Sequence, residues 1–194
     1  MARAEPGELI PGQGIFLGQY QPKDRTGNSL GKIFNVFAAP QDLPDTMKYA
    51  DLVKHIARLE AWHGFDGANY ATDKEIYAAL KDGSYNGGWI IPPRELLTGT
   101  EADSARGLRV GKVVQPDNLL RHKNKGAFKN TFKISTGSFG SPVWYWSSTE
   151  VANSPSKVWC AGFSNGQQDW TAKDNLLMHC RPVRLVEAPL PRPA

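Results

Sequence analysis

Hydrophobic and polar residues follow two different periods along this chain. From Tyr49 onward, apolar side chains recur every three to four positions, which predicts an amphipathic helix with Asp45 placed to cap its start. A second helix is expected to begin at Thr72, because Thr72 and Glu75 have the spacing of a capping box, and to end at Gly83. Both helices would bury one face against a core.

Strand signals lie on either side of these helices. GIFLGQY (14–20) and KIFNVFAA (32–39) are separated by turn-forming residues and predict two strands. The second is apolar on both faces, so we expect it to be well buried. NGGWIIPPRELL (86–97) predicts a short buried strand followed by a helical turn that opens at Pro93.

The last third of the chain has the pattern of an antiparallel meander. Four short apolar runs are separated by turn formers: VWYWSSTE (143–150), KVWCAGFS (157–164), QQDWTA (167–172) and LLMHCRPVRLV (176–186). In the first run, bulky residues are followed by small hydroxyl residues. Trp146 is expected in the core, whereas Ser147 and Ser148 would let another backbone approach and bond its carbonyls.

Residues 98–142 show little periodicity apart from a short helix expected near 118–123. We therefore expect a single domain over residues 1–188 that carries a loop-rich basic insertion at 98–142. Residues 189–194 form a Pro-rich tail.

The charge of the chain is concentrated in that insertion. Eight basic residues and one acidic residue lie between Arg106 and Lys133, in a chain of 194 residues with a net charge of +4. The stretch RHKNKGAFKNTFK (121–133) could contact the phosphates of a nucleic acid or another acidic surface. The alternative is a solvated, mobile loop.

Two further features bear on where the protein is located and on the state of its cysteines. No apolar run reaches the roughly 18 residues that a membrane-spanning helix needs, and the N-terminus lacks the apolar segment of a signal peptide. The localisation therefore stays open between a virion or surface assembly and the cytoplasm. Cys160 and Cys180 could form one bridge or remain two buried thiols, and the second reading is favoured.

Catalytic and metal-binding motifs are not evident. HGFDG (63–67) is interpreted as a turn after the first helix, with Asp66 bonding backbone, and GSFG (137–140) lacks the spacing of a nucleophile elbow. QPDN (115–118) contains the Gln-Pro-Asp signature of calcium- and galactose-binding C-type lectins, but no Trp-Asn-Asp partner follows it. We predict that the protein is not an enzyme and binds no metal or cofactor.

Several motifs together resemble a bacterial family of unassigned function that has a C-type lectin-like fold. The resemblance rests on WIIPPREL (89–96), YWSSTE (145–150), WCAGFSNG (159–166) and CRPVR (180–184). It covers roughly residues 86–186. It implies an α+β domain in which N- and C-terminal strands pair, two helices pack alongside small antiparallel sheets, and a long insertion leads into the last sheet.

Related members of that fold include phage receptor-binding proteins and the variable proteins of diversity-generating retroelements. The resemblance implies a binding face near the C-terminus, drawn from residues 153–157 and 167–175. The predicted ligand-binding residues are Trp170, Gln167, Gln168, Asp169, Asn153, Ser154, Ser156, Asp174, Asn175 and Tyr145. The predicted structural residues are Trp146, Ser147, Ser148, Trp89, Trp159 and Arg184.

These residues favour a non-catalytic protein that binds a cell-surface glycan or protein, as a receptor-binding component of a phage or prophage or as a surface adhesin. Amide and hydroxyl side chains around one aromatic anchor are typical of recognition surfaces. The alternatives are a retroelement-diversified variable protein, nucleic-acid or acidic-surface binding through the basic insertion, and an oxidase like the formylglycine-generating enzymes, which share the fold.

Overall fold

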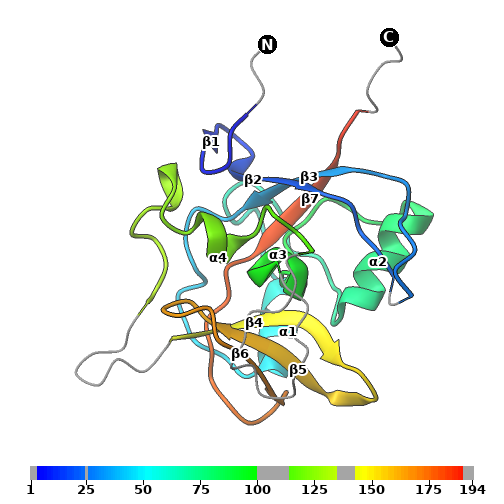
Figure 1. Ribbon diagram of the computed structural model, residues 1–194, viewed down its shortest axis with the longest axis vertical. Helices are drawn as coiled ribbons and strands as arrows, with labels where there is room; N and C mark the ends of the chain where they lie inside the picture. The colour runs from blue at the N-terminus through cyan, green and yellow to red at the C-terminus, as the bar shows by residue number, and fades with distance from the viewer. Residues whose placement is uncertain (1–3, 25, 100–113, 135–142, 190–194) are drawn as a thin grey trace.

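The computed structural model describes residues 4–24, 26–99, 114–134 and 143–189, which form an α+β arrangement with two antiparallel sheets (Figure 1). The four-stranded sheet lies at the end of the molecule nearest both termini, and the three-stranded sheet lies at the opposite end. Across these residues, no helix is long and apolar enough to cross a membrane.

The four-stranded sheet joins the two ends of the sequence. Its strands are ordered β1 (Leu9–Ile10), β2 (Gly14–Tyr20), β3 (Phe34–Ala38) and β7 (Val183–Glu187), each antiparallel to its neighbour. The strand predicted at 14–20 is confirmed. The strand predicted at 32–39 is present as β3, and most of its side chains are buried, as its apolar pattern predicted.

The three-stranded sheet is a meander of β4 (Trp144–Val151), β5 (Ser154–Gly162) and β6 (Gln168–Ala172). The run predicted as its fourth strand, 176–186, does not join it on the β6 side. Its first part follows the far edge of β4, where Trp146 N donates to His179 O at 3.0 Å, and its last part becomes β7 in the other sheet. The apolar pattern indicated a strand but carried no information on its neighbour.

The helices are short and border the two sheets. They are α1 (Tyr49–Ala57), α2 (Asp73–Asp82), α3 (Arg94–Thr98), α4 (Leu119–His122) and the 3₁₀ turn η1 (Gly126–Phe128). For α2 the predicted cap and stop are confirmed: the Thr72 side chain accepts from Glu75 N, and Gly83 adopts the left-handed conformation. The Glu75 carboxylate reaches back to Ala71 N at 2.6 Å, one residue before the position that a capping box uses.

The predicted cap of α1 is wrong. The helix begins at Tyr49 after Lys48, and no side chain caps it. Asp45 lies too far upstream, because the intervening chain runs extended: Met47 N donates to Met178 O at 3.1 Å. Because this segment pairs with the chain at Met178, the helix begins at Tyr49 and not directly after Asp45, as the sequence pattern predicted.

Two apolar clusters fill the interior. One lies against the four-stranded sheet and includes Leu17, Val36 and Leu96. The other lies between α1, which is seen behind the three-stranded sheet, and the strands of that sheet (Figure 1). In this second cluster the Trp146 ring packs edge-on against Tyr49 at 5.5 Å, and its indole N–H donates to Met47 O at 2.8 Å.

The described part of the predicted insertion is structured. The short helix expected near 118–123 is confirmed as α4, and Phe128 and Phe132 are buried in the first core cluster. The stretch 121–133 is therefore not a wholly solvated loop: its two aromatic side chains lie in the core, while Arg121, Lys125, Lys129 and Lys133 are exposed. Residues 100–113 and 135–142 of that insertion, and the tail from 190 onward, lie outside the described residues.

Candidate ligand-binding surface

Two turns meet at one end of the three-stranded sheet. The β4–β5 turn contains Asn153, which has a left-handed φ of 60°, and the turn after β6 contains Asp174 and Asn175. The two turns are joined where Lys173 N donates to Ser156 O at 3.1 Å. We call this region the hairpin-end surface, defined by Asn153, Ser154, Ser156, Lys157, Trp170, Asp174 and Asn175.

Trp170 is the aromatic centre of the hairpin-end surface. It lies half-buried on β6, directly opposite Trp159 of β5. Two positions before Trp159, and so on the same face of the sheet, Lys157 places its Nζ atom 3.8 Å from the centre of the Trp170 ring. The cation and the sheet together fix the ring in place while part of it stays exposed.

Polar and apolar groups are exposed in the two turns near this ring. Asn153, Ser156, Asp174 and Asn175 are exposed, and Ser154 is half-buried. The chain then continues into two exposed leucines, and the side chain of Leu177 is 63% accessible. Such a mixture of amide, hydroxyl and apolar groups around an aromatic anchor is the composition of recognition surfaces.

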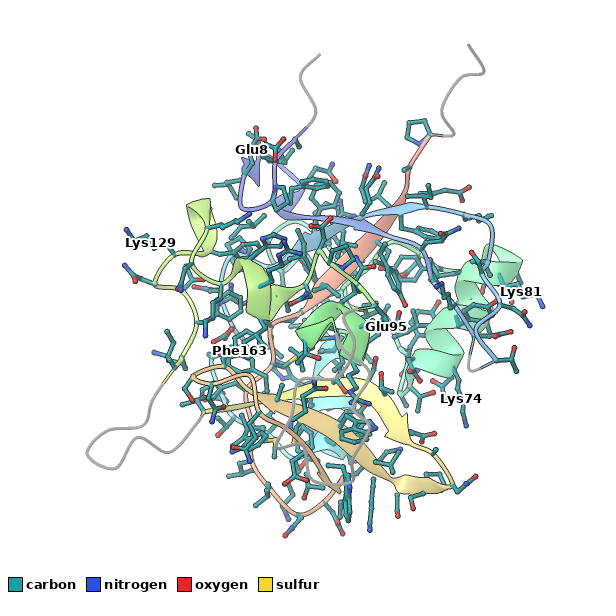
Figure 2. All side chains as sticks on the ribbon, viewed as in Figure 1. Glu8, Lys74, Lys81, Glu95, Lys129 and Phe163 are labelled. Carbon is teal, nitrogen blue, oxygen red and sulfur yellow. The ribbon has the colours of Figure 1, made fainter. Side chains whose placement is uncertain are left out.

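An ion cluster holds the base of this surface. Glu150 near the end of β4 is 9% exposed and accepts from Lys173 Nζ at 2.8 Å. The Nζ atom of Lys74, which Figure 2 labels on α2, lies 3.5 Å from Glu150 Oε2. Burial acts to raise the pKa of Glu150, but the two ammonium groups outweigh it and the net pKa is lowered. The cluster ties the turn after β6 to β4 and α2, so the hairpin-end surface is preorganised.

Two predicted ligand-binding residues, Tyr145 and Gln168, are buried and therefore cannot contribute to a binding surface. Tyr145 is fully buried, and its hydroxyl donates to Asp42 Oδ2 at 2.7 Å. Gln168 is 2% exposed, and its Oε1 accepts from Arg94 Nε at 2.7 Å. Alternation along β4 places Tyr145 against the interior. Gln168 shares the face of β6 that carries Trp170, and it is buried there because Arg94 covers that end of the face.

Two more predicted residues lie apart from the others. Gln167 sits in the β5–β6 turn at the opposite end of the sheet, where its carbonyl accepts from Gly162 N at 2.8 Å. Asp169 is half-buried and alternates with Trp170, so it belongs to the other face, and its Oδ1 accepts from Trp170 N at 2.8 Å. The structure thus brings together six of the ten predicted binding residues.

Sequence reasoning included Lys157 in the predicted face at 153–157 but not among the ligand-binding residues, and it missed the leucine pair. A signal for Lys157 was present, because a basic residue two positions before a strand tryptophan shares its face and can reach the ring on the neighbouring strand. No comparable signal marked Leu176 and Leu177 as exposed, since their apolar character suggested core.

The residues predicted as structural form the support beneath the sheet. Ser147 Oγ donates to Trp159 O at 2.9 Å, and Ser148 N donates to Pro92 O at 2.9 Å. Trp89 is buried and its indole N–H donates to Trp62 O at 2.7 Å. The guanidinium of Arg94 lies 3.8 Å over the Trp159 ring.

Arg184 is the remaining residue of that set. It is 4% exposed, its Nη1 donates to Gly87 O at 3.2 Å, and its guanidinium lies 3.4 Å over the Phe65 ring. It connects β7 to the segments before and after α2.

The two cysteines are free and buried, which agrees with the favoured reading. Burial raises the pKa of both Cys160 and Cys180, and Cys160 Sγ donates to Asp169 O at 3.4 Å. Within the described ranges, no three His, Cys, Asp or Glu side chains are grouped closely enough to hold a metal ion.

The HGFDG turn has the role that was predicted for it. Asp66 Oδ1 accepts from Ala61 N at 2.8 Å, so its carboxylate closes the turn after α1. GSFG (137–140) lies outside the described residues.

The QPDN side chains also bond within the chain. Gln115 Nε2 donates to Gln19 O at 2.6 Å, and Asn118 Oδ1 accepts from Arg121 N at 2.9 Å as the cap of α4.

Comparison of the sequence with models of protein families and with curated proteins found no match.

Proposed function

We propose that this protein is a non-catalytic ligand-binding protein that recognises a cell-surface glycan or protein through the hairpin-end surface. The observation that carries the proposal is the half-buried Trp170 ring, held 3.8 Å from Lys157 Nζ near the end of the sheet where the two turns expose Asn153, Ser156 and Asn175. A fixed aromatic ring loses little conformational entropy on binding, and the amide and hydroxyl groups around it adapt to the partner.

The arrangement of elements supports the finer proposal of a C-type lectin-like fold. The C-terminal strand β7 lies in the same sheet as the N-terminal strands, and a meander precedes it. In that fold the binding face lies on the last sheet near the C-terminus, as the hairpin-end surface does here. The corresponding biological setting is a phage or prophage receptor-binding component or a surface adhesin.

The buried cysteines favour a binding protein over a thiol oxidase. A reactive thiol needs a low pKa and access to its substrate, whereas burial gives Cys160 and Cys180 the opposite properties. Neither thiol is among the groups that define the hairpin-end surface.

A screen of purified protein against immobilised glycans and intact bacterial cells tests the proposal. The Ser156→Arg variant places a large charged side chain on the hairpin-end surface, and Ser84→Arg, at an exposed serine just after α2, is the matched control. We expect the parent and Ser84→Arg to bind the same ligand and Ser156→Arg to lose it. Equal binding by all three proteins would place recognition elsewhere.

A further inference from the structure

The sequence holds two Asn-Gly pairs, Asn86–Gly87 and Asn165–Gly166. In such a pair the backbone nitrogen of the glycine can attack the carboxamide carbon of the asparagine, because glycine has no side chain to obstruct the approach. One pair follows α2, whose last turn carries the Lys81 labelled in Figure 2, and the other lies in the β5–β6 turn. Neither pair belongs to the hairpin-end surface.

The two asparagine side chains are held in the same way. Both are exposed. Asn86 Oδ1 accepts from Gly88 N at 3.0 Å, and Asn165 Oδ1 accepts from Gln167 N at 3.0 Å. Each bond closes an Asx-turn, which folds the carboxamide over the peptide group that follows it. Apart from a long contact of 3.5 Å from Asn165 Nδ2 to Gln167 Oε1, the asparagines are matched.

The glycine nitrogens differ. Both glycines have a left-handed φ, 77° at Gly87 and 75° at Gly166. Gly166 is buried, and its N–H donates to Gly162 O at 2.9 Å. Gly87 is half-buried, and its N–H donates no hydrogen bond to the residues that the structure describes. Because the nitrogen must lose its proton before it attacks, the bonded N–H of Gly166 is protected and that of Gly87 is not.

Water can reach the first pair. Asn86 and Gly87 line a cavity of about 450 Å³ that lies between the end of α2 and β7. One water molecule occupies about 30 Å³ in the liquid, so the cavity has room for several. The co-reactant that hydrolysis needs therefore has access to Asn86.

We propose that Asn86–Gly87 is a site of spontaneous deamidation in the folded protein, whereas Asn165–Gly166 is protected. Gly87 N gives its proton to hydroxide and forms a bond to Asn86 Cγ. The bond from Cγ to the side-chain nitrogen breaks, and that nitrogen takes a proton from water and leaves as ammonia. Water then opens the cyclic imide at either of its carbonyls, which yields aspartate or isoaspartate. The net reaction consumes one water and releases one ammonia.

This modification changes the attachment of β7. Gly87 O accepts from Arg184 Nη1 at 3.2 Å, and Arg184 is buried. Isoaspartate lengthens the backbone before Gly87 by one carbon, so it displaces the carbonyl that the guanidinium contacts. A buried donor that loses its acceptor destabilises the fold. Protein that carries isoaspartate at this position should therefore unfold at a lower temperature than fresh protein.

Mass spectrometry of proteolytic peptides tests the proposal. The purified protein is incubated at mildly alkaline pH, and the mass increase that converts an amide to an acid is followed at both pairs. We expect Asn86 to deamidate about three- to tenfold faster than Asn165, which is the difference that one intact hydrogen bond to the attacking nitrogen predicts. Equal rates in the folded protein, or faster reaction at Asn165, would overturn the proposal.

The same incubation in urea separates the effect of the fold from that of the sequence. Both pairs should then react at similar rates, because the bond from Gly166 N to Gly162 O is absent from the unfolded chain. A preference for Asn86 that persists unchanged in urea would come from the neighbouring residues and would contradict the role of the fold.

The Asn86→Gln variant tests the consequence for stability. Its peptide should show no mass increase, while Asn165 reacts as in the parent. After equal incubation, the parent should lose thermal stability and the variant should keep that of its own fresh sample. An equal loss in both proteins would contradict the link between deamidation at Asn86 and the attachment of β7. The site is independent of the function proposed for the hairpin-end surface.

Discussion

Arg181 Nε donates to Asp42 Oδ1 at 2.7 Å, across 139 positions of sequence, and both side chains are buried. The same guanidinium also donates to Thr131 O at 2.7 Å and to Ala39 O at 3.2 Å. Arg181 therefore fastens three distant segments: the loop after β3, the end of the 121–133 stretch and the approach to β7. Its partner Asp42 also receives the hydroxyl of Tyr145.

We expect Arg181→Met to destabilise the fold by about 3–5 kcal/mol, because it leaves Asp42 as an uncompensated buried charge. Urea unfolding measures the change. The surface pair Lys32–Glu187, with side chains 38% and 55% exposed, provides the control. Lys32→Met should cost about 0–1 kcal/mol. A loss of similar size in both variants would show that the Arg181 network contributes little.

Two adjacent serines in β4 provide a matched test of buried hydroxyl groups. Ser147 Oγ donates to Trp159 O, whereas Ser148 Oγ is buried without a hydrogen-bond partner in the described residues. Ser147→Ala should cost about 0.5–1.5 kcal/mol, because it removes a buried hydrogen bond to a carbonyl, and Ser148→Ala should be neutral or stabilising. Chemical denaturation of both variants checks this; the reverse order would contradict the assigned bonds.

Glu150 should make stability depend on pH at the acid side. Its pKa is lowered in the folded state from an ordinary value of 4.5, so it stabilises the fold fully above that value. This contribution is lost as the pH falls through the folded-state pKa. Unfolding free energies of the parent and Glu150→Gln should therefore differ most above the ordinary pKa and converge below it.

The exposed Glu60→Gln is the control for that titration. Its difference from the parent should stay small at every pH. A constant gap between the parent and Glu150→Gln down to the lowest pH at which the parent folds would show that the Lys173 and Lys74 contacts are not responsible.

The two thiols should be unreactive in the native protein. Cys160 and Cys180 are buried and burial raises their pKa, so a disulfide reagent such as DTNB should modify neither within the time in which it modifies both after denaturation. Rapid modification of one thiol in the folded protein would reopen the reading of the chain as a thiol enzyme.

Most of the local structure could be predicted from sequence, because period and capping are local properties. The Thr72–Glu75 box and Gly83 marked both ends of α2, and the apolar run at 14–20 marked β2. The start of α1 could not be predicted, since pairing of Met47 with Met178 across the fold keeps the chain extended past Asp45.

Only part of the candidate surface could be predicted from sequence, because its turns are local features whereas the burial of its side chains depends on the whole fold. The turns that contain Asn153 and Asn175 are read directly from sequence, and the meander brings them together. Whether Tyr145 faces outward depends on which side of the sheet the core covers, and Gln168 is buried because Arg94 covers its end of the Trp170 face; both are tertiary properties. Likewise, Phe128 and Phe132 lie in a basic, turn-rich stretch whose composition hides their packing into the core.

The most direct test of the account is the dissociation constant of Trp170→Ala for the ligand that the screen identifies. Truncation of a central aromatic anchor typically costs about 2 kcal/mol or more, so we expect affinity to fall by roughly 30-fold or more. Circular dichroism at the assay temperature must show the variant folded. An unchanged dissociation constant in the folded variant would contradict the claim that the hairpin-end surface is the binding site.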